Sequence, residues 1–125
     1  DHTVGTQIDI VPTIMGRLGG EVRHQCWGRD LLNLPEGDTG FGVIKPSGSE
    51  QTTAIVTADQ ILVLPKDKDM SAKVYQYQLG ATPSAEVISD APRAAELKHK
   101  LEAFLQTATK SLMDNTAGVI NGKPD

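Results

Sequence analysis

The chain has 125 residues, a formal net charge of −4, a pI near 5.3 and a hydrophobic content of 38 % with two Phe, two Tyr and one Trp. This length suits one domain, or a subdomain with a connecting arm, and the composition allows a modest core. The acidic balance and the lack of a basic run exclude a typical nucleic-acid-binding surface. No apolar stretch approaches the roughly 20 residues of a membrane-spanning helix, and the single cysteine, Cys26, excludes an internal disulfide.

The first structured stretch is predicted to be a short strand that turns into a short helix. Residues 8–11 (IDIV) are mostly apolar and β-branched, which favours a buried strand end. Pro12 fits the first helical turn, where its missing N–H costs nothing, and Gly19-Gly20 ends the helix. A unit this short cannot bury its own apolar side, so we expect another body of protein to cover it.

Residues 21–33 are predicted to be a connector with a local apolar cluster. We expect Gly28 to make a tight turn and Asp30 to cap a turn or to receive the side chain of Arg29. The side chains expected to pin the connector to a core are apolar: Trp27, Leu31, Leu32 and Leu34. Pro and Gly within residues 34–38 (LPEGD) stop regular structure, and we place a boundary there.

From Phe41 the pattern changes to that of strands. Short strands joined by small loops, with no helix between them, predict an antiparallel meander. The strands are expected at Phe41–Ile44, Thr52–Thr57, Ile61–Leu64 and Lys73–Leu79, with a short edge strand at Glu86–Ser89.

A long helix is predicted over Pro92–Met113, with Asp90 as its N-cap. One apolar stripe runs along it and should cover a face of the meander: Leu97, Leu101, Phe104, Leu105, Ala108 and Leu112. Residues 115–125 are expected to form a loose tail. The predicted fold is therefore α+β: a small antiparallel sheet of about four strands packed against one long C-terminal helix, preceded by a strand-helix arm.

Two segments of the arm resemble a known family. QIDIVPTIMGRLGG (residues 7–20) and WGRDLL (residues 27–32) are similar to the late part of sulfatase-like hydrolases and transferases of the alkaline phosphatase superfamily. The greatest similarity is to the membrane-anchored phosphoglycerol transferases of the lipoteichoic-acid-synthase type. The residues that match are Asp9, Pro12, Thr13, Gly28, Asp30, Leu31 and Leu32.

The resemblance implies that this chain is the C-terminal piece of such an enzyme, and we do not expect it to catalyse anything alone. Residues 1–34 would complete the large α/β catalytic domain, and residues 35–125 would form a C-terminal subdomain beside it. The nucleophile and the divalent metal (Mn²⁺, Mg²⁺, Ca²⁺ or Zn²⁺) would belong to upstream parts of the protein, with no cofactor held here. The resemblance also implies a location at the periplasmic or extracellular face of the bacterial inner membrane, with any membrane anchor upstream of Asp1.

Individual candidates for chemistry receive structural interpretations, so we assign no catalytic, cofactor-binding or metal residue. We expect Asp9 to fix the turn before Pro12 by accepting N–H bonds from Thr13 or its neighbours. The hydroxyl of Thr13 has no base at a useful spacing. The remaining candidates lack a second ligand or a partner group, namely Asp1-His2, His24, His99 and Cys26. Tyr75 and Tyr77, on one strand face, are expected to pack rather than to stack on bases or sugars.

Two hypotheses about function remain open. In the first, the missing catalytic domain of the same protein is the partner of this chain, and self-association through the arm is a further expectation. In the second, residues 35–125 form a free-standing binding or interaction module and residues 1–34 dock onto a partner. The order or mobility of that arm in the isolated chain separates the two hypotheses.

Overall fold

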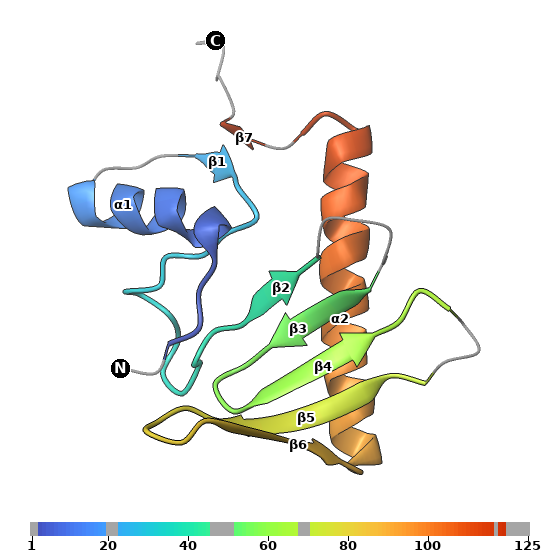
Figure 1. The fold of residues 1–125 in the computed structure, drawn as a ribbon. Coiled ribbons are helices and arrows are strands. Elements are labelled where there is room, and N and C mark those ends of the chain that lie inside the picture. Colours follow the sequence, from blue (N-terminus) through green and yellow to red (C-terminus); the bar gives the residue numbers. More distant parts are fainter. Residues whose placement is uncertain (1–2, 20–22, 46–51, 68–70, 117, 120–125) are drawn as a thin grey trace, which may run out of the picture.

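The computed structural model describes residues 3–19, 23–45, 52–67, 71–116 and 118–119, and its α+β architecture confirms the predicted class (Figure 1). Five antiparallel strands form one sheet in the order β2-β3-β4-β5-β6, where about four strands and a short edge strand were expected, and β6 is that edge strand. A long helix, α2, crosses one face of this sheet. The strands are β2 (Gly42–Ile44), β3 (Thr53–Val56), β4 (Gln60–Leu64), β5 (Lys73–Gln78) and β6 (Ser84–Ile88).

A single row of apolar residues across the sheet forms the floor of the core. Neighbours in the row are register partners, and they belong to all five strands in turn: Val43, Ile55, Leu62, Val74 and Ile88. The three central members are buried together with Leu97 and Leu101 of α2. Because alternate residues of a strand point to opposite faces, this row fixes which face of the meander the helix covers.

Helix α2 (Ala91–Met113) begins where the sequence predicts, and Asp90 caps it by accepting a hydrogen bond from the backbone N–H of Arg93 at 2.9 Å. The predicted stripe is buried at Leu97 and Leu101, but Leu112 is 63 % exposed because the helix extends past the sheet. The ring of Phe104 meets that of Phe41 edge to face, with centroids 6.1 Å apart. Among the described residues, no helix combines the length and the hydropathy needed to cross a membrane.

The arm (residues 3–34) starts differently from the prediction. The expected strand over residues 8–11 is wrong, because Gln7–Asp9 form a 3₁₀ turn (η1) that leads directly into α1 (Ile10–Leu18). The carboxylate of Asp9 accepts the N–H of Thr6 at 2.8 Å, and this local bond closes the turn before an extended strand can form. Gly19 ends the helix with a φ of 72°, as predicted.

The arm pairs with the rest of the molecule at two places. Val4 forms a parallel bridge with Gly40, with a hydrogen bond from its N–H to the carbonyl of Thr39 at 2.8 Å. Further along the arm, β1 (His24–Gln25) pairs antiparallel with β7 (Gly118–Val119). This pairing corrects the expectation of a loose tail for those two residues, whereas residues 120–125 lie outside the described part.

Candidate functional site

The residues that carry the family resemblance meet in one polar cluster beneath α1. The side chain of Asp9 is fully buried there. Its Oδ1 accepts the backbone N–H of Arg29 at 2.7 Å, and its Oδ2 accepts the N–H of Thr6 at 2.8 Å and the hydroxyl of Thr6 at 3.3 Å. The two segments are thus joined through one carboxylate across 20 positions of sequence.

Arg29 extends this cluster towards the sheet. Its guanidinium lies 3.4 Å from the carboxylate of Asp9 and donates from Nη2 to the carbonyl of Phe41 at 2.5 Å. The guanidinium carbon also lies 4.1 Å from the centroid of the Phe41 ring, and Lys100 Nζ lies 4.4 Å from the same centroid. Of the two roles expected for Asp30, the structure shows the cap: its carboxylate accepts the N–H of Leu32 at 3.0 Å. The other role belongs to Asp9, which receives the side chain of Arg29.

The hydroxyl of Thr13 forms hydrogen bonds with backbone groups of both segments of the cluster. It donates to the carbonyl of Asp9 at 2.7 Å and to that of Arg29 at 3.3 Å, and it accepts the N–H of Leu31 at 3.1 Å. The expected bond from the N–H of Thr13 to the carboxylate of Asp9 is replaced by these contacts. A hydroxyl engaged in this way supports structure and not nucleophilic attack.

The pKa of Asp9 is set by opposing effects. Burial alone raises it, but the hydrogen bonds from the backbone of Arg29 and Thr6, followed by the guanidinium of Arg29, lower the pKa below the ordinary value of 3.8. The carboxylate is therefore charged at neutral pH. Both of its oxygens already accept N–H donors, so it does not fit the role of a metal ligand or of a general base.

Two glycines are required by close approach in this cluster. A Cβ on Gly28 would overlap the backbone carbonyl of Ile8, and one on Gly16 would overlap the carboxylate of Asp30. Gly28 therefore allows two backbones to touch, whereas the sequence analysis expected a tight turn. The matched residues in this cluster have packing or hydrogen-bonding roles: Asp9, Thr13, Gly28 and Asp30. The side chain of Leu32 is 57 % exposed, so the expectation that it pins the connector to a core is wrong.

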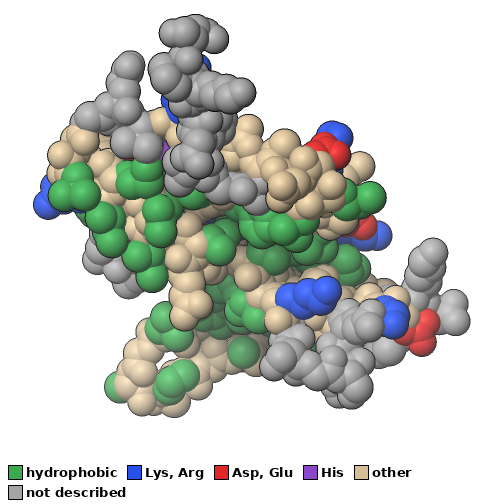
Figure 2. Space-filling view, turned by 90° about the horizontal axis from the view of Figure 1, so that it is seen from above, with side chains coloured by type: hydrophobic (Ala, Val, Ile, Leu, Met, Phe, Trp, Pro, Cys, Tyr) green, Lys and Arg blue, Asp and Glu red, His purple; other side chains and the backbone are tan. Residues whose placement is uncertain are grey.

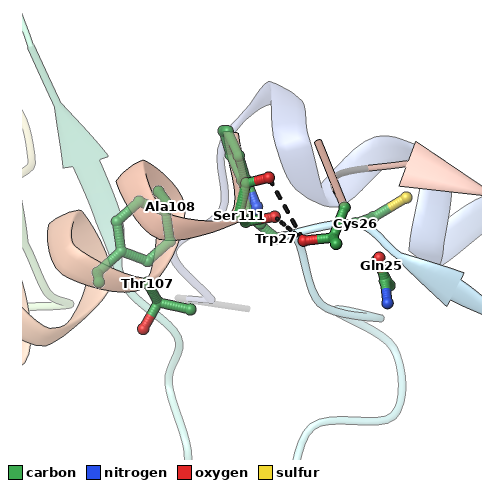
Figure 3. A pocket seen from close by; sticks show the side chains of 8 residues that line it. Gln25, Cys26, Trp27, Thr107, Ala108 and Ser111 are labelled. Carbon is green, nitrogen blue, oxygen red and sulfur yellow. Dashed lines mark hydrogen bonds between the residues drawn. The ribbon is translucent and has the colours of Figure 1, made fainter. Parts of the chain in front are cut away.

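A groove separates the arm from the C-terminal half of α2. One hollow of about 660 Å³ is lined by Ile8 and Trp27 of the arm, Val43 and Ile44 of β2, and Phe104 of α2, among others. A second hollow of about 400 Å³ shares Trp27 and Phe104 and has a hydroxyl-bearing rim from α2 and Thr116 (Figure 3). Trp27 Nε1 is buried and has no acceptor among the described residues.

The opposite side of α1 presents apolar side chains to solvent. Ile10, Val11 and Ile14 are each 50–53 % exposed, and Leu18 is 80 % exposed. Their spacing places them on one helical stripe, hereafter the α1 stripe. Figure 2 shows hydrophobic side chains gathered at the left of the view, the side on which α1 lies in Figure 1.

The imidazoles and the tyrosines do not assemble into a site. The Nδ1 of His24 accepts the N–H of Cys26 at 3.3 Å, and His99 lies exposed on α2. The hydroxyl of Tyr77 donates to the carbonyl of Thr57 at 2.5 Å. Within the described ranges, no three His, Cys, Asp or Glu side chains are close enough to hold a metal ion. Asp1-His2 lies outside those ranges.

Sequence reasoning missed two features, the Asp9–Arg29 pair and the groove around Trp27. Opposite charges 20 positions apart carry no local periodicity, and the groove exists only because α2 passes the arm in space. Comparisons with known proteins add no relative: no family model matches the chain, and no curated protein or solved structure matches it.

Proposed function

We propose that this chain is the C-terminal part of a sulfatase-like, metal-dependent hydrolase or transferase that acts on phosphate or sulfate esters. Phosphoglycerol transfer to glycans or lipids of the cell envelope is the specific activity that the resemblance favours, at the periplasmic or extracellular face of the inner membrane. The chain itself contributes packing and does no chemistry. The observation that carries this proposal is the exposed α1 stripe above a polar cluster that engages both carboxylate oxygens of Asp9.

The physical support is a mismatch between the two sides of α1. The inner side is fixed by hydrogen bonds that the carboxylate of Asp9 accepts and that the hydroxyl of Thr13 donates, so the helix is held in one orientation. The outer side exposes four large aliphatic side chains. Burying one such side chain completely stabilises by about 1.5–3 kcal/mol, so covering the stripe would favour docking by several times the thermal energy. A prearranged apolar helix face suits a permanent neighbour within the same polypeptide.

The divalent metal of the proposed enzyme would be held elsewhere. The carboxylate of Asp9 is occupied by N–H donors, and that of Asp30 accepts from Leu32 and Asn33. Carboxylates that already accept hydrogen bonds from backbone and side-chain donors offer no open face to a cation. Asp9 and Asp30 therefore do not fit a metal site, and the part of the chain that the structure describes holds no group of three such ligands.

A second candidate function is a free-standing interaction module. It is favoured by the contacts that tie the arm to the sheet, namely the bond from Arg29 to the carbonyl of Phe41 and the pairing of Val4 with Gly40. In that reading the α1 stripe is a docking face for a separate partner. The boundary predicted between residues 34 and 35 stays a prediction under both readings.

The native polypeptide provides the decisive experiment. Antibodies raised against this chain should isolate from the source cells a membrane-associated protein much longer than 125 residues. That protein should release p-nitrophenol from a phosphodiester or sulfate ester, and EDTA should abolish the release. A native polypeptide of about this length without such activity would support the interaction module instead.

The isolated chain provides an independent check with Mn²⁺ as the probe. Calorimetric titration should detect no tight binding, because the carboxylates of the cluster are engaged. Tight binding of Mn²⁺ or Mg²⁺ by the isolated chain would contradict the assignment. Hydrogen exchange then separates the two readings: a mobile arm favours the fragment, and full protection in a monomer favours the module.

A further inference from the structure

The face of the sheet opposite α2 is apolar and carries no element among the described residues (Figure 1). Alternation along the strands places on it the residues that lie between the members of the core row. Val87 is 61 % exposed and Ile44 is 48 % exposed, and the more central members are partly exposed. This outer face consists of Ile44, Ala54, Val56, Ile61, Val63, Tyr75, Tyr77, Ala85 and Val87.

The outer face has opposite charges at its two ends. Lys73 begins β5 on this face and is exposed. Asp59 precedes β4 and lies beside the other end of β5, where its carbonyl accepts the N–H of Tyr77 at 2.9 Å. The pKa of the Tyr77 hydroxyl is raised, first by burial and then by the carboxylate of Asp59, in line with a negative charge beside that ring. Apolar residues of the outer face thus lie between Lys73 and Asp59.

We propose that two copies of this chain pack sheet against sheet through the outer face, with Lys73 of each copy opposite Asp59 of the other. A two-fold axis that lies in the interface and runs across the strands reverses the strand direction, so the basic end of one sheet meets the acidic end of its mate. Two sheets packed face to face are about 10 Å apart, and their inner side chains interdigitate. The same surface then serves both copies, as a closed two-fold dimer requires.

The size of this face sets the strength of the dimer. Five strands spaced about 4.8 Å apart, with about four residues each at 3.3 Å, span roughly 250–320 Å² per copy. Two copies would bury about 500–640 Å², less than the roughly 1,000 Å² of a stable interface. The dimer is therefore weak and depends on protein concentration, and its register depends on the charge pairs.

Sedimentation velocity of the isolated chain from about 10 μM to about 1 mM covers the range in which such a dimer forms. Lys73→Asp and Asp59→Lys should each raise the dissociation constant about tenfold, because each places like charges opposite each other twice. The double exchange Lys73→Asp/Asp59→Lys should restore the original constant. Lys98→Asp, on the solvent side of α2, is the matched control and should leave it unchanged. Circular dichroism of each variant checks folding.

Several results would overturn the proposal. A monomer at all concentrations excludes the dimer. Single exchanges that weaken it without rescue by the double exchange show that these charges do not face each other. Loss of the dimer in Ile14→Asp, with Lys73→Asp unaffected, would place self-association on the α1 stripe. Protection of the outer face in a monomeric, longer native polypeptide would assign that face to another part of the same protein.

Discussion

The arm and the sheet–helix unit (residues 40–113) are stabilised in opposite ways. The sheet–helix unit encloses an apolar row, and its helix contributes Leu97 and Leu101 to a core that excludes water. The arm encloses a polar cluster around Asp9 and exposes its large aliphatic side chains. Apolar burial supplies most of the free energy of folding, whereas hydrogen bonds chiefly select one conformation.

This contrast indicates what each region contributes. The sheet–helix unit contains the buried apolar core, and the cluster gives the arm a defined shape through hydrogen bonds. The hydrogen bond from Arg29 to the carbonyl of Phe41 connects the arm to the sheet–helix unit. Perturbing the core should therefore affect both regions, and perturbing the cluster should affect the arm alone.

The largest effect is expected from Leu101→Ala. Leu101 is fully buried against the sheet, and truncation of a buried leucine costs about 2–5 kcal/mol through lost burial and a cavity. Urea denaturation followed by circular dichroism should show this loss, with the arm released at the same time. Leu112→Ala is the control on the same helix, because Leu112 is mostly exposed and should change stability by less than about 0.5 kcal/mol. Equal effects of the two changes would mean that the helix stripe is not the core.

The next effect is expected from Asp9→Asn. The amide keeps the shape of the carboxylate, but its NH₂ group faces an N–H of Thr6 or Arg29 and the guanidinium loses its counter-charge. We expect about 2 kcal/mol of local destabilisation, seen as about 30-fold faster hydrogen exchange at the amides of Thr6 and Arg29. The amides of β4 should be unaffected.

Glu102→Gln, on the exposed side of α2, is the matched control for the loss of one negative charge. It should leave exchange in the arm unchanged. If Asp9→Asn also loosened β4, the arm would belong to the folding unit of the sheet, and the contrast between the two regions would fail.

Most of the sheet–helix unit could be predicted from the sequence, because periodicity is a local property. Alternation in residues 73–78 and the apolar stripe from Leu97 to Leu105 each reflect the geometry of one element. The positions of strands and helix therefore agree with the prediction within one or two residues. The end of the stripe does not, since the exposure of Leu112 depends on where the sheet stops.

The arm could not be predicted in the same way. Residues 8–11 have the composition of a strand, but one hydrogen bond from the N–H of Thr6 to Asp9 decides the backbone. The partner of Arg29 lies 20 positions away, whereas the sequence offered only its neighbour Asp30 as one alternative. Long-range polar pairing leaves no periodic signal, so the pairing of Asp9 with Arg29 is visible only in the structure.

A smaller effect is expected from Gly28→Ala, which separates close packing from charge within the arm. The added Cβ overlaps the backbone of Ile8, which cannot move without displacing η1, and we expect a loss of about 1–2 kcal/mol in the stability of the arm. Gly80→Ala is the matched control, because a Cβ at Gly80 meets nothing within 4 Å. Hydrogen exchange at the amide of Arg29 measures the stability of the arm in both variants. A silent Gly28→Ala would mean that the two segments do not touch as closely as the cluster requires.

The smallest effect concerns acid, and its sign follows from the cluster. The folded-state pKa of Asp9 is lowered, so the stabilisation from its charge is present above the unfolded-state value near 3.8 and is lost as the pH falls through the folded-state value. The stability of the arm should therefore decrease below about pH 4, by at most about 1.4 kcal/mol per pH unit for one proton. Hydrogen exchange of arm peptides between pH 5 and pH 3, corrected for intrinsic rates, measures this slope. Asp9→Asn keeps the other carboxylates of the arm, so the difference in slope between the original chain and this variant gives the contribution of Asp9. A stability that instead increased on acidification would mean that burial, and not the N–H donors, determines the charge of Asp9.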